Sequence, residues 1–325
     1  MAARNVGETR DGVELTNLDQ PLFDGAGATK RDLIDYLDGV RSRILPVLED
    51  RPLSVIRLMR GQEAFMQKNV PKYTPDFVRT VKFWAETSKR DVNYALCNDR
   101  KTLLWFANQR AIEYHPALVR VQRPDHVTHM VLDLDPPGDG DNSSAAQFKM
   151  AVQVAHLVRR ALADVGLTGA VKTSGAKGVH IFVPVDDETS IEDVAHAARA
   201  VAVRTERLDP KLATTAFTKE DRGHKVFVDS TRVGGATVIC ACSPRVRPGV
   251  PVSFPLSWDE VDDVTPTDFT VHTALDRLGD TDPWREHMPK PQALPADLVA
   301  EGNEIPVARV QAMHEGKRRK REREK

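Results

Sequence analysis

The chain has 325 residues, a net charge of −1 at pH 7, 41% hydrophobic residues and 29% charged residues. This composition is ordinary for a soluble globular protein and excludes a collagen-like fibre or a disordered chain. The longest apolar runs fall far short of the ~18 residues that a membrane span requires. No signal peptide is visible, so a cytoplasmic location without membrane contact is expected.

The chain contains three cysteines, Cys97, Cys240 and Cys242. An odd count without a signal peptide argues against a disulfide framework. We expect all three to be small buried side chains, with metal ligation as a minor alternative.

Charge is distributed unevenly along the chain. Residues 316–325 carry seven basic and two acidic side chains, which leaves the rest of the chain net negative. An acidic body does not favour nucleic-acid binding over the whole surface, so such contacts are expected from a local basic surface or from the tail. We predict one domain over residues 1–315 and a disordered basic tail over residues 316–325.

The first predicted element is a helix over residues 29–50, with Thr29 as its N-cap and apolar residues at helical spacing. Pro52 ends this helix, and residues 53–58 have the pattern of a strand. Residues 102–106 fit a strand or a helix, and periodicity does not decide between them.

The middle of the chain interleaves strands and helices. Strands are predicted over residues 127–135, 170–173, 179–183 and 226–229, and helices over residues 145–165 and 191–208. A glycine pair at 234–235 predicts a turn into residues 236–241, and frequent prolines from residue 244 onward predict loops and a wrapping C-terminal arm. Because hairpin-like pairs occur among the strands, we predict an α+β fold with mixed or antiparallel sheets, not a doubly wound one.

Two aspartates end the strand predicted over residues 127–135. Asp133 and Asp135 are two residues apart, so they share one face of the strand. Two carboxylates placed in this way repel each other unless a cation lies between them, and hard oxygen ligands suit Mg²⁺ or Mn²⁺. A solvated acidic turn is the alternative, because a bare Asp-x-Asp pair is common.

A turn containing glycine and lysine joins the next two predicted strands, at residues 174–178. Its glycines would allow backbone N–H groups to approach an anion, while Ser174 adds a hydroxyl and Lys177 a positive charge. His180 enters the following strand and can point toward the same place. The turn lacks the residue order of a Walker A loop, yet it fits a triphosphate cradle. A tight hairpin with incidental lysines is the alternative, although it leaves His180 unexplained.

A third carboxylate, Asp229, ends the apolar strand predicted over residues 226–229. Downstream, Thr237 offers a hydroxyl, and Arg245 and Arg247 offer guanidiniums that could clamp a phosphate. An exposed basic loop is the alternative for the arginines. Taken together, three carboxylates, the preceding turn and an arginine pair describe two-metal nucleotidyl transfer, in which a 3′-hydroxyl attacks the α-phosphate of a nucleoside triphosphate.

At these residues the chain resembles the primase-polymerase domain of bacterial ligase D, within the archaeo-eukaryotic primase superfamily. The resemblance runs from about residue 15 to about residue 284, with its markers at residues 133–136, 173–180, 226–229, 243–249 and 255–258 and further matches at 15–19, 29–36 and 112–116. The most specific marker is the Ser-Gly-x-Lys-Gly-x-His order between two acidic motifs. The resemblance implies a primase-like α+β core of mixed or antiparallel sheets flanked by helices.

The resemblance also implies a role for each matching residue. Asp133, Asp135 and Asp229 would hold two divalent ions, often Mn²⁺ in this family, with Mg²⁺ as the alternative. The residues expected to contact the incoming ribonucleoside or deoxyribonucleoside triphosphate are Ser174, Lys177, His180, Thr237, Arg245 and His115. The residues expected to contact DNA are Lys30, which would grip a 5′-phosphate, Phe65 and Met66, which would pack on the templating base, and Arg247.

The chain departs from the family pattern at several places, which include a loop one residue shorter before Arg245 and Cys242 in place of the usual tyrosine. Gln20 stands where the family has a second lysine for the 5′-phosphate, which predicts weaker 5′-phosphate recognition. Met66 replaces a second stacking aromatic residue and is softer than an aromatic ring. Residues 230–233, Ser-Thr-Arg-Val, replace an aromatic residue followed by Gln-Asn.

By this resemblance, residues 1–125 carry DNA-contacting segments, residues 126–260 the catalytic centre, and residues 261–315 a C-terminal arm. The chain has no room for a ligase or nuclease domain, so it is most similar to standalone relatives that work beside separate ligases such as ligase C. We expect a template-directed repair polymerase that adds one or a few nucleotides, preferentially ribonucleotides, at short gaps or broken ends of duplex DNA. Excision repair and end joining are both open, and a separate ATP-dependent DNA ligase and a Ku-type protein are the expected partners at the bacterial nucleoid.

Two other functions account for fewer of these residues. A phosphatase of the haloacid dehalogenase type also places Asp-x-Asp at a strand end, but Pro136 follows Asp135 directly and residues 174–180 have no role in it. A non-catalytic DNA-end binding module would not need the three acids, Lys177 and His180, all of which are present. Pyrophosphate release on a gapped template, against binding without turnover, distinguishes a polymerase from such a module.

Overall fold

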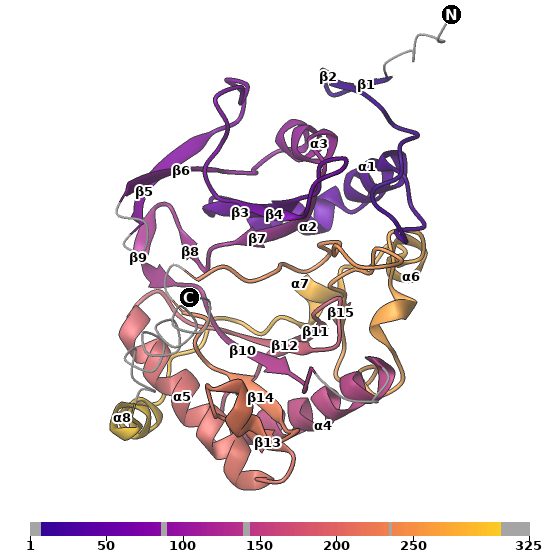
Figure 1. Ribbon diagram of the computed structural model, residues 1–325. Helices are drawn as coiled ribbons and strands as arrows, with labels where there is room; N and C mark the ends of the chain where they lie inside the picture. Colours follow the sequence, from indigo (N-terminus) through magenta and orange to yellow (C-terminus); the bar gives the residue numbers. More distant parts are fainter. Residues whose placement is uncertain (1–7, 86–89, 139–143, 234–235, 307–325) are drawn as a thin grey trace, which may run out of the picture.

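The structure, a computed structural model, describes residues 8–85, 90–138, 144–233 and 236–306 (Figure 1). The turn predicted at residues 234–235 and the basic tail predicted at 316–325 lie outside these residues. No helix within the described ranges is long and apolar enough to cross a membrane. Cys97, Cys240 and Cys242 are all buried and free, which confirms the sequence prediction.

A six-stranded central sheet carries the middle of the chain. Its strand order is β13-β14-β10-β12-β11-β15, and all neighbours are antiparallel except the parallel pair β13 and β14. The strands are β10 (His129–Asp135), β11 (Ala170–Thr173), β12 (Val179–Pro184), β13 (Ala213–Thr214), β14 (Val226–Asp229) and β15 (Pro255–Leu256). The predicted α+β class with mixed sheets is therefore confirmed.

Two long helices cover one face of this sheet. Helices α4 (Ser144–Ala163) and α5 (Ile191–Leu208) pack against β10, and α8 (Ala296–Glu304) packs on the outer side of α5 (Figure 1). Leu132 and Leu134 of β10 are fully buried. Because side chains alternate along a strand, Asp133, which lies between these leucines, is on the opposite face, which the two helices leave open.

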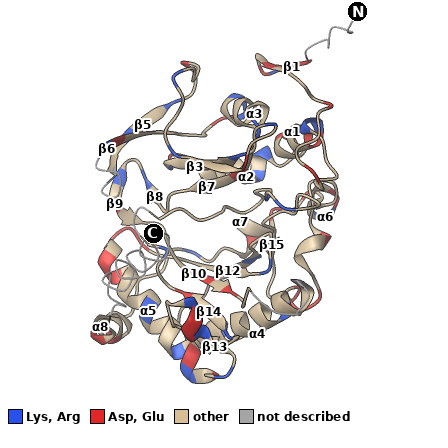
Figure 2. Ribbon diagram, in the orientation of Figure 1, with Lys and Arg blue, Asp and Glu red and all other residues tan. Residues whose placement is uncertain are grey.

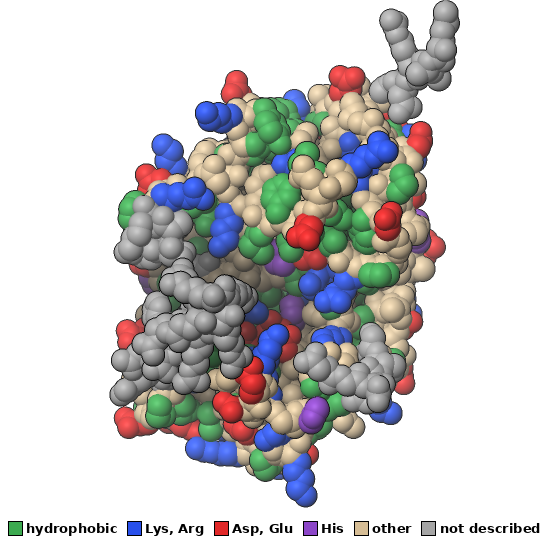
Figure 3. Space-filling model, viewed as in Figure 1, with side chains coloured by type: hydrophobic (Ala, Val, Ile, Leu, Met, Phe, Trp, Pro, Cys, Tyr) green, Lys and Arg blue, Asp and Glu red, His purple; other side chains and the backbone are tan. Residues whose placement is uncertain are grey.

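A five-stranded sheet in the N-terminal part lies across a hollow from the central sheet (Figures 1 and 3). Its strands are β3 (Leu53–Arg57), β4 (Phe65–Gln67), β5 (Thr80–Ala85), β6 (Arg90–Ala95) and β7 (Ala111–Pro116), and its helices are α1 (Lys30–Gly39), α2 (Arg41–Leu48) and α3 (Arg100–Asn108). The remaining elements are β1 (Glu8–Arg10), β2 (Val13–Leu15), β8 (Val119–Arg120), β9 (Arg123–Val127), the 3₁₀ turns η1 (Lys219–Arg222) and η2 (Pro266–Asp268), α6 (Ala274–Leu278) and α7 (Pro283–His287).

The helix predicted over residues 29–50 is two helices. Thr29 caps α1 as predicted, and Thr29 and Asp32 form a reciprocal capping box. The break follows Gly39, where an added Cβ would lie 2.8 Å from a methyl carbon of Leu275. The Leu275 side chain of α6 therefore packs directly on this glycine, and glycine is a poor helix former.

Three further predictions change in detail. The single strand predicted over residues 127–135 is interrupted at Thr128, where the chain leaves the hairpin of β8 and β9 and enters the central sheet. Residues 102–106 belong to helix α3, whose N-cap is Asp99. Residues 236–241 form only an isolated bridge between Thr237 and Ala117.

Candidate active site

A row of polar side chains crosses four strands of the central sheet on its open face. Register pairs Asp133 of β10 with Asp229 of β14 on one side and with His180 of β12 on the other, and His180 pairs with Lys172 of β11. Directly paired residues in antiparallel strands point to the same face. The predicted acids Asp133 and Asp229 and the predicted His180 are therefore brought together, and Asp135 follows on the same face of β10. Figure 2 shows acidic residues in red near the labels of β10 and β14.

The buried Asp133 is held by a histidine and an arginine. Its Oδ1 lies 3.1 Å from Nε2 of His180, and its Oδ2 lies 3.2 Å from Nη2 of Arg232. Burial alone would raise the pKa of Asp133, but His180 and Arg232 hold it well below the usual range of an aspartate.

The pKa of Asp135 is shifted in the opposite direction. Although its side chain is exposed at the strand end, neighbouring protein atoms restrict its hydration. This desolvation, together with the carboxylates of Asp133 and Asp229, raises the pKa of Asp135 to about 6. Mutual repulsion of this kind is what a divalent cation relieves, so the charge of the cluster suits such an ion.

Lys172 was not predicted as a site residue, yet it lies at the buried end of the polar row. Its Nζ lies 2.9 Å from Nδ1 of His180 and donates to Oγ of Ser253 at 2.6 Å. Burial lowers the pKa of Lys172 to about 7 and that of His180 to about 4. Because the Asp133 carboxylate only accepts, Nε2 of the neutral His180 carries the proton donated to it, and Nδ1 of His180 accepts from Nζ of Lys172. The sequence feature that could have identified Lys172 as a site residue is its position within an otherwise apolar strand.

The turn between β11 and β12 is fixed by its own hydrogen bonds. Backbone N–H groups of Ala176 and Gly178 donate to Oγ of Ser174 at 3.2 and 3.1 Å. An added Cβ at Gly178 would lie 2.5 Å from the carbonyl oxygen of Leu134, so close strand packing itself requires this glycine. The backbone N–H groups of Ala176 and Gly178 thus face the hydroxyl of Ser174, whereas the sequence predicted that N–H groups of this turn would approach an anion.

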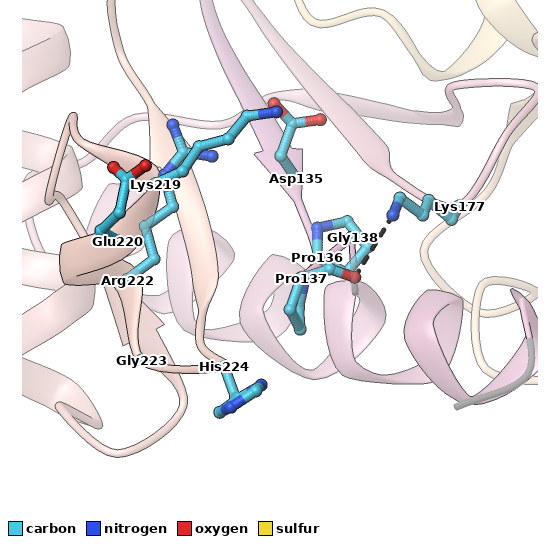
Figure 4. Close-up of a pocket in the computed structure, with 10 residues that line it drawn as sticks. All are labelled: Asp135, Pro136, Pro137, Gly138, Lys177, Lys219, Glu220, Arg222, Gly223 and His224. Carbon is cyan, nitrogen blue, oxygen red and sulfur yellow. Dashed lines mark hydrogen bonds between the residues drawn. The ribbon is translucent and has the colours of Figure 1, made fainter. Parts of the chain in front are cut away.

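Lys177 extends from this turn to the carbonyl oxygen of Pro137, at 3.2 Å. It borders a cavity of about 360 Å³ beside Asp135. Figure 4 shows Lys177 on one side of this cavity and the basic side chains of η1 on the other, with Asp135 between them. The lining residues are Asp135, Pro136, Pro137, Gly138, Lys177, Lys219, Glu220, Arg222, Gly223 and His224. Sequence reasoning missed the contribution of residues 219–224, which carry no motif.

A second unpredicted residue, Glu113, links two predicted ones. Its carboxylate accepts from Nε2 of His115 at 2.9 Å, pairs with Nε of Arg245 at 3.1 Å and accepts from the backbone N–H of Val246 at 2.9 Å. Burial alone would raise the pKa of Glu113, but His115 and Arg245 lower it to about 2. Arg245 in turn donates to the carbonyl oxygen of Ser174 at 2.6 Å, so His115, Arg245 and the turn form one connected group.

The residues predicted to contact DNA differ in their exposure. Lys30 is 3% exposed, and its Nζ donates to Thr16 O at 2.6 Å and to Oδ1 of Asn108 at 2.7 Å. Phe65 and Met66 are exposed on β4. Arg247 is exposed. Thr237, which is predicted to contact the nucleotide and not DNA, is half-buried beside β7.

The three carboxylates offer the oxygen donors that Mg²⁺ and Mn²⁺ prefer. They are not gathered around one point, however: among the residues that the structure describes, no group of three or more His, Cys, Asp or Glu side chains could hold a metal ion as it stands. Asp133 and Asp229 face Arg232 instead. The donor set fits divalent cations in chemistry and charge, and binding would require these side chains to rearrange.

Comparison with known proteins gives a consistent result. The sequence model of the LigD primase-polymerase domain matches residues 29–284. The polymerase domain of Mycobacterium tuberculosis ligase D, solved in complex with DNA, superimposes with a TM-score of 0.75 and 33% identity over 85% of this chain and 99% of that chain. The fold therefore places the protein in the primase-polymerase class. The chain belongs to the LigD primase-polymerase domain family, which confirms the resemblance found in the sequence.

Curated relatives are longer proteins. The bifunctional non-homologous end joining protein LigD of Bacillus subtilis (strain 168) is 35% identical over 273 residues, 82% of this chain and 42% of that protein. The multifunctional non-homologous end joining protein LigD of Mycolicibacterium smegmatis is 32% identical over 276 residues, 83% of this chain and 35% of that protein. The chain thus spans less than half the length of these relatives.

Proposed function

We propose that this protein is a template-directed repair polymerase that adds one or a few nucleotides, preferentially ribonucleotides, to a 3′-hydroxyl at short gaps or broken ends of duplex DNA. The observation that carries the proposal is the pairing of Asp133 with Asp229 across adjacent strands, with Asp135 on the same face. The names of the relatives support a role in end joining. Gap filling in excision repair is the second pathway that we consider.

In this proposal the three carboxylates hold two divalent ions, Mn²⁺ or Mg²⁺. When bound, such ions lower the pKa of the primer hydroxyl and neutralise charge on the triphosphate. The protein's own contribution is position: β10 and β14 fix the backbones of Asp133 and Asp229, and His180 orients Asp133 through its Nε2 hydrogen bond. Rigid strands place such ligands more accurately than loops would.

The nucleotide would enter between the turn at residues 174–178 and the cavity beside Asp135. Lys177 borders that cavity and can exchange its contact with Pro137 O for a phosphate oxygen. Arg245 and His115 lie on the other side of the turn, joined through Glu113, and can contact the sugar or phosphates. Thr237 is the remaining nucleotide contact that we propose.

We propose that this chain binds DNA, because the solved relative is in complex with DNA. Phe65 and Met66 expose apolar surface on β4 that could stack on a templating base. Lys30 and Arg247 are the proposed phosphate contacts, and Lys30 must give up an internal hydrogen bond to reach a 5′-phosphate. A separate DNA ligase and a Ku-type protein, at chromosomal DNA in the cytoplasm, are the proposed partners.

The test is primer extension on a gapped duplex with Mn²⁺ and labelled nucleotides. Asp133→Asn and Asp229→Asn should each reduce extension at least roughly a hundredfold, because each removes a metal ligand. Asp187→Asn, at an aspartate with 84% of its side chain exposed, is the matched control and should extend normally. Normal extension by either site variant would show that these carboxylates do not carry the reaction.

A further inference from the structure

Arg232 lies between the two paired carboxylates of the site. Its Nη2 is 3.2 Å from Oδ2 of Asp133, and its Nε is 3.3 Å from Oδ2 of Asp229. One guanidinium therefore bridges acids from two adjacent strands. The position falls in residues 230–233, where the sequence departs from the family pattern, so the bridge is a feature of this chain that the family assignment does not explain.

The other oxygen of each carboxylate already has a partner. Oδ1 of Asp133 faces Nε2 of His180 at 3.1 Å. Oδ1 of Asp229 accepts from the backbone N–H of Thr231 at 2.8 Å and from its hydroxyl at 2.6 Å. The two Oδ2 atoms are thus the oxygens left for a cation, and Arg232 contacts both.

A guanidinium cannot lose its charge near neutral pH, so Arg232 leaves the site only by moving. Its side chain is 38% exposed and therefore has space toward solvent. A nucleoside triphosphate is the polyanion expected beside it, and guanidinium pairs well with phosphate. An incoming triphosphate could draw the guanidinium away while the carboxylates accept a metal ion in its place.

We propose that Arg232 is a built-in cation that competes with one divalent ion for Oδ2 of Asp133 and Asp229, and that nucleotide binding relieves this competition. The inference rests on the proposed function, which assigns these acids to the metal ions. It makes metal binding and nucleotide binding mutually reinforcing: the ion binds weakly to the free protein and more tightly once a triphosphate is present. By linkage, the ion must strengthen nucleotide binding by the same factor.

The test measures Mn²⁺ binding directly, from the electron paramagnetic resonance signal of free Mn²⁺, with and without a non-hydrolysable nucleoside triphosphate. Without nucleotide, Arg232→Gln should bind Mn²⁺ roughly tenfold more tightly than the unaltered protein, because two part-exposed ion pairs no longer oppose the ion. Nucleotide should then tighten Mn²⁺ binding less in the variant than in the unaltered protein.

Arg222→Gln is the matched control, because Arg222 borders the same acidic cluster through the cavity at Asp135 but makes no ion pair with Asp133 or Asp229. It removes the same charge without removing the bridge. Equal Mn²⁺ affinities for Arg232→Gln and Arg222→Gln would overturn the proposal. Should Arg232→Gln fail to give a cooperative melting transition, Arg232→Lys serves instead: a single ammonium cannot bridge both acids as the guanidinium does, so tighter Mn²⁺ binding than in the unaltered protein is expected.

Asp133→Asn separates this inference from the proposed function. If Asp133→Asn abolishes Mn²⁺ binding while Arg232→Gln leaves it unchanged, the metal assignment stands and the competition by Arg232 is wrong. If Mn²⁺ binding is insensitive to Asp133→Asn, the metal assignment itself fails, and the competition fails with it.

Discussion

Charged side chains at this site are held by protein partners that the linear sequence does not place beside them. The hydrogen-bonded row of Lys172, His180 and Asp133 is one example, in which the buried lysine contacts one ring nitrogen of the histidine and the other ring nitrogen orients the acid. The three acids and His180 could be predicted, because their motifs mark strand ends. Glu113 and Arg232 could not, because no motif marks them and their partners Arg245 and Asp133 come from distant segments.

Glu113 is predicted to act as a positioning residue for the nucleotide. Glu113→Gln removes the negative charge that His115 and Arg245 share, so both should lose their fixed orientation. We expect the nucleotide KM to rise roughly tenfold, the equivalent of one charge-assisted hydrogen bond, with a much smaller change in kcat. Steady-state incorporation kinetics measure both, and Glu188→Gln, at an exposed residue, is the control. A fall in kcat without a change in KM would contradict a positioning role.

We expect the recognition of a 5′-phosphate by Lys30 to depend on pH. Burial, and then the charge of Arg110, lower the pKa of Lys30 to about 8. The ammonium that would bind a phosphate is therefore present below that pH and is lost above it. The ratio of affinities for gapped duplexes with a 5′-phosphate and a 5′-hydroxyl should fall between about pH 7 and about pH 9, as measured by fluorescence anisotropy.

Lys30→Gln should remove this pH dependence and lower the ratio at about pH 7. The lowered pKa of Lys30 also makes the stability of the protein depend on pH. The unfolded chain binds more protons at this lysine between the lowered and the ordinary pKa, so the free energy of unfolding contributed by Lys30 rises as the pH rises through that interval. An affinity ratio that is independent of pH and of Lys30 would show that another residue reads the 5′-phosphate.

At the scale of elements, the hairpin of β11 and β12 determines the nucleotide side of the site. The sequence predicted both strands and the turn, and it assigned the glycines to phosphate contact. The structure gives those glycines a packing role as well: Gly175 has φ +68°, and an added Cβ would lie 2.6 Å from Cγ of Arg245 and 2.9 Å from the backbone nitrogen of Ser253. Contacts between residues far apart in the chain have no local sequence signal. The sequence therefore predicted the turn but not its packing against Arg245 and Ser253.

Gly175→Ala should therefore destabilise the protein more than its backbone conformation alone requires. Gly166→Ala is the matched control, because Gly166 has φ +74° and nothing within 4 Å of an added Cβ. We expect about 1 kcal/mol for the control and about 1–3 kcal/mol more for Gly175→Ala, from denaturant unfolding. Equal losses for the two variants would contradict the close packing of Arg245 on this turn.

At the scale of the whole molecule, residues 238–246 connect the two sheets across the hollow. The backbone N–H groups of Val238 and Cys240 donate to β7 carbonyl oxygens at 3.3 and 3.1 Å, and Oγ of Ser243 accepts from the N–H of Tyr114 at 2.9 Å. Local patterning predicted the α+β class and the main strands and helices of the central sheet. It could not predict this connection or the break after Gly39, because both depend on contacts between residues far apart in the chain.

The central claim is that this arrangement copies a template. The most direct measurement is single-nucleotide incorporation at a gap with Mn²⁺, made opposite each of the four templating bases and with both ribonucleotides and deoxynucleotides. We expect the complementary nucleotide to be incorporated in every case, ribonucleotides to be preferred, and Asp229→Asn to abolish the product. Incorporation that ignores the templating base, or that persists in Asp229→Asn, would contradict the central claim.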